Sequence, residues 1–103
     1  MQVIKKIADY ISEELEGAEN YAKCALKWKD ERPELAKVFY EISTDEMRHV
    51  SLLHGEVAKI IEEHRREKGE PPAAMMAVWD YVHEKHIEEA NEVRMLQNQY
   101  RGM

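Results

Sequence analysis

The sequence predicts an all-α protein built from three long helices that run up, down and up. Three observations lead to this fold class. Of the 21 acidic residues, 17 are Glu and only 4 are Asp, while Gly (4) and Pro (3) are scarce in 103 residues. Glu favours helices, whereas Asp, Gly and Pro favour caps, turns and breaks. Only two short segments look like breaks, and apolar residues between them recur at helical spacing. We expect one domain over residues 1–103.

The first helix is expected over residues 2–29. Its apolar positions recur every three or four residues, which is typical of the buried stripe of a bundle helix. They include Ile4, Ile7, Ile11, Ala18 and Tyr21. The helix should end at the charged segment 28–33, where Asp30 could cap the next helix and Pro33 could sit in its first turn.

The second and third helices are expected over residues 33–67 and 72–101. Gly69 suits the C-terminus of one helix and Pro72 the start of the next. We expect the second helix to have a buried stripe at the same spacing. In chain order it consists of Leu35, Phe39, Ile42, Glu46, His49, Leu53, Glu56 and Ile60. Both connections are too short to be domain linkers.

Charge and composition exclude several classes of protein. The formal net charge is -6, so there is no basic excess to drive binding to nucleic acid. Residues 1–10 mix charged and apolar side chains, which fits neither a signal peptide nor a membrane span. Cys24 is the one cysteine and cannot form an internal disulfide, so we expect a reducing, cytoplasmic setting without membrane contact.

Carboxylates and imidazoles interrupt the middle of each apolar stripe. Glu14 does so in the first helix, Glu46 and His49 in the second, and His86 and Glu89 in the third. An isolated buried charge is costly, so such groups are normally paired or bind a metal. Glu46 and His49 form an E-x-x-H motif, in which residues three apart can face one ion. Oxygen and imidazole ligands suit iron, manganese or zinc better than calcium or magnesium.

The heights of these residues along the bundle agree. Glu14 lies about as far before the first break as Glu46 and His49 lie after it, so the three should be level. Glu89 and His86 match the level of His49 less closely. They could complete the same site, or His86 could pair with His54 nearer that end.

At these residues the chain resembles the ferritin-like, rubrerythrin-related di-metal carboxylate proteins, which use a Glu on one helix and E-x-x-H on the next. The resemblance covers about residues 5–60 and is carried by the stretches Glu14–Tyr21 and Phe39–His49. It implies that Glu14, Glu46 and His49 are ligands and that Glu41 is an additional acidic position. It also implies that Tyr21 hydrogen-bonds a ligand or passes an electron.

A second half of such a site is missing after Pro72. Encapsulated ferritins resemble this plan, because two short chains meet on a two-fold axis to assemble one site. We therefore favour a homodimer or higher homo-oligomer in which Glu14, Glu46 and His49 face their copies. In the rival arrangement, His86 and Glu89 of the same chain complete the site.

The resemblance implies a pair of iron ions, or manganese, with ferroxidase or peroxide-reducing activity. The chain has no CxxC pairs for a rubredoxin-type domain, so a peroxidase would need an external electron donor. Two alternatives remain open: a zinc site, and a non-catalytic oligomerisation module with a polar layer in its interface. His54 and His83 are expected at an interface or on the surface, and Cys24 as a small buried thiol.

Overall fold

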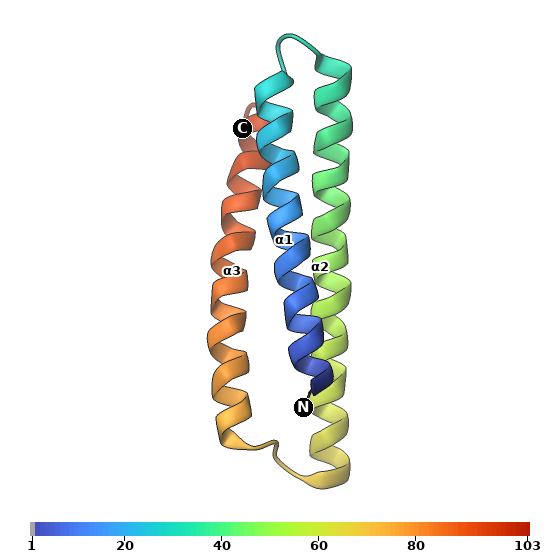
Figure 1. The fold of residues 1–103 in the computed structure, drawn as a ribbon, viewed down its shortest axis with the longest axis vertical. Helices are drawn as coiled ribbons and strands as arrows, with labels where there is room; N and C mark the ends of the chain where they lie inside the picture. The colour runs from blue at the N-terminus through green and yellow to red at the C-terminus, as the bar shows by residue number, and fades with distance from the viewer. Residues whose placement is uncertain (1) are drawn as a thin grey trace.

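The computed structural model describes residues 2–103, which form three α-helices and no strand. Helix α1 spans Gln2–Trp28, α2 spans Pro33–Lys68 and α3 spans Ala73–Arg101 (Figure 1). The predicted all-α class and the three helices are confirmed, and each helix end lies within one residue of the expected position.

The chain reverses direction at two tight connections. At the first, the backbone N–H of Arg32 donates to the carbonyl of Trp28 at 2.8 Å, and Pro33 opens α2. The N-cap of α2 is Arg32 and not Asp30, so the expected role of Asp30 is wrong. The second connection begins at Gly69, whose φ of 85° favours glycine, and its N–H donates to the carbonyl of Arg65.

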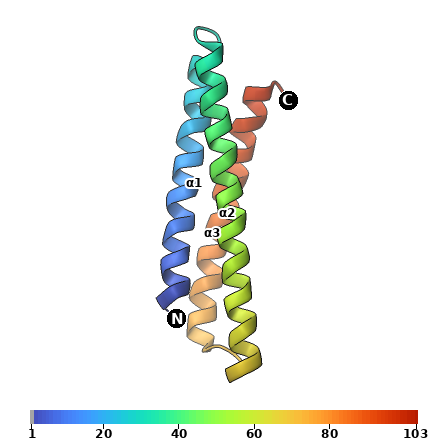
Figure 2. The ribbon, with the colours of Figure 1, turned by 90° about the vertical axis from the view of Figure 1, so that its right-hand side faces the viewer.

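Helix α1 is the central element of the bundle. It packs along both α2 and α3, whereas α2 and α3 touch each other little. Figure 1 shows α1 between α3 and α2, and Figure 2, turned by 90°, shows α3 behind the α1/α2 pair. The molecule is elongated, 56 × 20 × 18 Å, and its two helix–helix interfaces both depend on α1.

The core lies between the three helices. Near the start of α1 it contains large apolar side chains, among them Ile11, Leu15, Val57 and Trp79. Farther along, the helices approach through small residues, and Ser43 of α2 is fully buried there. The Ser43 hydroxyl donates to the carbonyl of Ala18 at 2.7 Å and accepts from Nε2 of Gln97 at 2.9 Å. This pair of hydrogen bonds ties all three helices together.

The buried stripe of α2 is displaced from the expected one by one residue. Its buried residues are Ala36, Ser43, Val57 and Ile61, while Leu35 is 39% exposed. The displacement follows from the position of α3. This helix packs on one side of the α1/α2 pair, so the residues of α2 nearer that side are the buried ones. The stripe that we expected to be buried through Ile42, His49 and Leu53 is instead half-buried along one edge of the α1/α2 contact.

No helix within residues 2–103 combines the length and the apolar character that crossing a membrane requires.

Candidate metal centre

Glu14 and His49 meet across the α1/α2 interface. Oε2 of Glu14 lies 3.3 Å from Nδ1 of His49, near the middle of both helices. Both side chains keep access to solvent, with exposed fractions of 31% and 42% respectively. Glu14 and His49 therefore lie at the same level along the two helices, as expected, and their carboxylate and imidazole are in contact.

Glu46 joins this pair from the preceding turn of α2. Its carboxylate lies against Gly17 of α1, in the space that a Cβ atom at residue 17 would fill. Burial raises the pKa of the Glu46 carboxyl, the negative charge of Glu14 raises it further, and the imidazole of His49 partly offsets both. A bare helix surface at Gly17 thus lets a second carboxylate come close to Glu14.

The distance between the donor atoms of Glu14 and His49 can be compared with the distance between two ligands of one metal ion. Two donor atoms on one ion, each ~2.0–2.2 Å away and roughly 90–110° apart, are ~3.0–3.5 Å from each other. The 3.3 Å between Glu14 and His49 falls in this range. Yet no three His, Cys, Asp or Glu side chains among residues 2–103 are gathered in a way that would hold a metal ion. The carboxylates and the imidazole are chemically suitable metal ligands, but within one chain they are not gathered as a set that would hold an ion.

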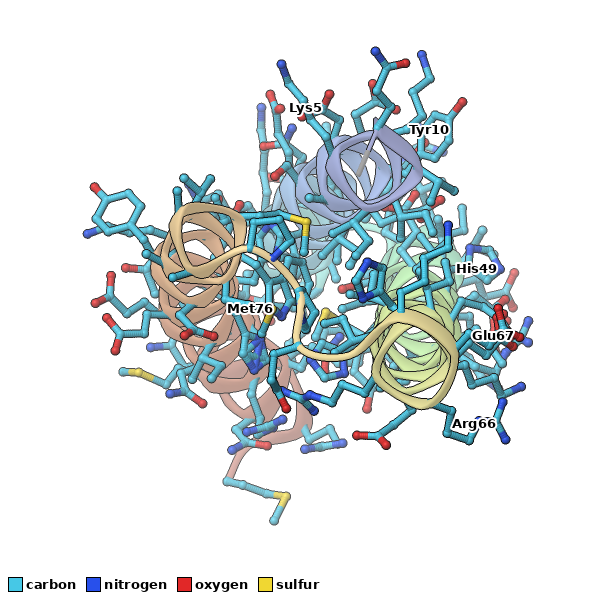
Figure 3. All side chains as sticks on the ribbon, turned by 90° about the horizontal axis from the view of Figure 1, so that it is seen from below. Lys5, Tyr10, His49, Arg66, Glu67 and Met76 are labelled. Carbon is cyan, nitrogen blue, oxygen red and sulfur yellow. The ribbon has the colours of Figure 1, made fainter. Side chains whose placement is uncertain are left out.

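The surroundings of this group are apolar and half-buried. Tyr21 of α1 packs against Phe39 of α2 with ring centroids 5.9 Å apart. Ile7, Ile42, Leu53 and Ile60 are also only partly covered. Figure 3, which looks along the bundle, places His49 and Tyr10 on the side of α1 and α2 that is farther from α3. The carboxylates and the imidazole thus lie within a partly covered apolar edge of the α1/α2 pair.

Two other predicted positions adjoin this group without entering it. Glu41 is exposed on α2, and its backbone carbonyl accepts a hydrogen bond from the hydroxyl of Thr44 at 2.8 Å. Tyr21 lies two turns after Glu14 and is half-buried through its contact with Phe39. The contact with Phe39 places the Tyr21 ring in the apolar edge.

His86 and Glu89 are placed away from Glu14, Glu46 and His49. Nε2 of His86 lies 2.9 Å from the hydroxyl of Ser12, on the α3 side of α1. Glu89 is partly buried, which raises the pKa of its carboxyl, and the charges of Glu19, Glu16 and Glu92 raise it further. In this arrangement the third helix does not bring its H-x-x-E pair to the carboxylates of the α1/α2 edge.

A second group of imidazoles lies between α2 and α3. It joins His86 to His54 and His83, the two histidines that we expected at an interface or on the surface. Nε2 of His54 is 3.2 Å from Nδ1 of His83, and the two rings stack with centroids 4.4 Å apart. His86 lines the same pocket. Burial, and then the neighbouring imidazoles, lower the pKa of His54 and of His86, so both rings are neutral at pH 7. A signal was present in the sequence, because His54, His83 and His86 lie at similar distances from the second connection.

Comparisons of the chain with models of known families, with curated proteins and with solved structures find no match.

Proposed function

We propose that this chain is one half of a di-metal carboxylate centre that two copies complete. Each copy would supply Glu14, Glu46 and His49 from its up-down-up bundle, giving four carboxylates and two imidazoles between two ions. The proposal is carried by one observation: these donors meet at the middle of a half-buried apolar edge that faces away from α3.

The apolar edge supports a second copy of the chain as the occupant. An exposed apolar edge is typical of a contact site. A carboxylate pair that such a contact covers is costly to bury unless a cation neutralises it. Within residues 2–103, helix α3 does not cover this edge, because it packs on the other side of α1. A second copy carries the same half-buried apolar residues on its own α1/α2 edge, so a two-fold contact would place apolar side chains against apolar side chains.

Iron is the metal that we favour, and manganese has the same ligand preference. A bound pair of iron ions would supply redox chemistry toward dioxygen or peroxide, that is, ferroxidase or peroxidase activity. The residues of the chain hold the donors in place. Glu14 and His49 keep each other oriented, and the closely packed Gly17 fixes where the Glu46 carboxylate can lie. Tyr21 and Phe39 pack against each other farther along the same two helices.

The test is anaerobic loading of the metal-free protein with Fe(II), followed by dioxygen or peroxide. We expect uptake of about one ion per chain, and a doubling of the molecular mass as two chains assemble. Oxidation of the bound Fe(II) should then appear as a change in optical absorption. The double variant Glu46→Ala/His49→Ala should lose uptake. Asp45→Asn, an exposed acid beside Glu46, is the matched control and should keep it. Wild-type protein that takes up no metal contradicts the proposal.

A non-catalytic oligomerisation module is the second candidate. It is favoured by the direct Glu14–His49 contact, since these side chains can satisfy each other without a metal. In that case the polar group would set the register of a helical interface. The two candidates differ in the effect of a chelator, which lowers the melting temperature only where a resident metal stabilises the fold.

A further inference from the structure

The three imidazoles of His54, His83 and His86 lie outside the centre proposed above. They come from two helices that otherwise touch little, with His54 on α2 and the other two on α3. All three line one pocket of about 260 Å³, together with apolar side chains such as Val50 and Ile87. Space and nitrogen donors therefore coincide at this place.

His54 and His83 already have the spacing of two ligands on one ion. Two nitrogens that each lie ~2.0–2.1 Å from a tetrahedral zinc ion are about 3.3–3.4 Å apart. Nε2 of His54 and Nδ1 of His83 are 3.2 Å apart. Trp79 stacks on the His83 ring with centroids 5.5 Å apart and limits how that ring can move.

His86 has the features of a third ligand. Its ring is 6% exposed, and its Nδ1 is buried without a hydrogen-bond partner among residues 2–103. A buried nitrogen without a hydrogen-bond partner is costly, and a bound cation would offset that cost. Its other nitrogen, Nε2, is held by the Ser12 hydroxyl at 2.9 Å.

We propose that His54, His83 and His86 form a separate, all-nitrogen site for a divalent transition-metal cation of the zinc class. Neutral imidazoles favour Zn²⁺, Ni²⁺ and Cu²⁺ over Ca²⁺ and Mg²⁺, which prefer oxygen ligands. The rings are not yet gathered around one point, so His86 must turn within the pocket for its Nδ1 to join the other two nitrogens. Residues 83 and 86 are three apart and therefore share a face of α3. The bound ion would join α2 to α3.

The experiment isolates this site from the carboxylate centre. Chelator-treated Glu46→Ala/His49→Ala protein is titrated with Co²⁺, whose absorption reports tetrahedral nitrogen coordination, and then with Zn²⁺ as competitor. We expect one ion to bind per chain. When Trp28 is replaced by Phe, the remaining tryptophan fluorescence comes from Trp79, and it should change as the ion binds. His83→Gln and His54→Gln should each weaken binding at least tenfold while circular dichroism shows intact helices.

The matched control is His64→Gln. His64 lies on α2 outside the pocket, where Nδ1 is 3.0 Å from the carbonyl of Gly69. Binding in this variant should equal that of the parent. The proposal is overturned if the folded parent binds no Co²⁺ or Zn²⁺, or if His83→Gln and His54→Gln bind as the parent does. Because Glu46 and His49 are absent throughout, either result leaves the proposed function to its own test.

Discussion

The carboxylate of Glu46 occupies the space beside Gly17 that any larger residue at position 17 would take. Glycine normally costs about 0.5–1 kcal/mol relative to alanine inside a helix. Here the absence of a side chain lets a carboxylate of α2 lie against the surface of α1. The absence of a side chain at residue 17 therefore matters for the position of the Glu46 carboxylate, and not for the backbone conformation of α1.

Gly17→Ala should separate metal binding from stability. The new Cβ overlaps the Glu46 carboxylate, which has to turn away, so metal uptake should fall at least tenfold while the helices remain folded. Gly55→Ala is the matched control, because a Cβ there meets nothing within 4 Å. It should raise the free energy of unfolding by about 0.5–1 kcal/mol and leave uptake unchanged. Fe(II) titration and denaturant unfolding check both. Equal uptake in the two variants would argue against a ligand role for Glu46.

Much of the fold could be predicted because its determinants are local. The scarcity of Gly and Pro and the two charged or proline-containing breaks define where the helices begin and end. Glu14 and His49 lie at the same level because similar numbers of residues separate each of them from the tight turn. Their contact is the outcome of that regularity.

Other features depend on tertiary packing and could not be predicted from one helix at a time. A 3-4 pattern identifies an apolar face but does not say which edge of it a third helix covers. In α2 the deeply buried residues are Ser43 and Val57, next to the expected Ile42 and Glu56. The contact between His54 and His83 likewise required knowledge of where α3 lies.

The apolar edge should be needed for assembly of two copies. Ile42 lies on α2 two turns before His49 and is half-buried. We expect Ile42→Lys to prevent dimer formation and to abolish metal uptake, since a charge would have to be buried against the second copy. Val78→Lys, at a residue of α3 that is 65% exposed, should do neither. Sedimentation of the Fe(II)-loaded protein measures the mass, and a dimeric Ile42→Lys protein would place the interface elsewhere.

Ser43→Ala should destabilise the whole bundle. The substitution leaves the carbonyl of Ala18 and the side-chain amide of Gln97 without their buried partner. A loss of about 1–3 kcal/mol in the free energy of unfolding is expected. Ser51→Ala removes only an exposed hydroxyl that donates to the carbonyl of Met47 at 3.4 Å, and it should change stability by less than about 0.5 kcal/mol. Similar urea midpoints for the two variants would contradict the role of Ser43.

Glu89 should make stability depend on pH. Burial and the charges of Glu19, Glu16 and Glu92 raise the pKa of its carboxyl in the folded state. The folded chain then holds its proton at a pH where the unfolded chain has lost it, so stability falls as pH rises through this range. Glu89→Gln should raise the melting temperature at pH 7 by roughly 1–3 °C and have little effect near pH 4. Thermal unfolding at both pH values measures this.

The same variant tests the rival intrachain site. Glu89→Gln should leave Fe(II) uptake unchanged, because Glu89 lies near Glu16 and Glu19 rather than near Glu14. Lost uptake would indicate that the carboxylate of Glu89 is a ligand in the metal-loaded protein, and a melting temperature that falls at pH 7 would contradict the destabilising effect of its charge.

The central claim is that two chains share one metal centre, and anomalous diffraction from a crystal of the iron-loaded protein tests it most directly. The account predicts two anomalous peaks at the contact between two chains, each within bonding distance of Glu14, Glu46 or His49 from both copies. Peaks bound within a single chain by His86 and Glu89, or no peak at these residues in metal-loaded crystals, would contradict it.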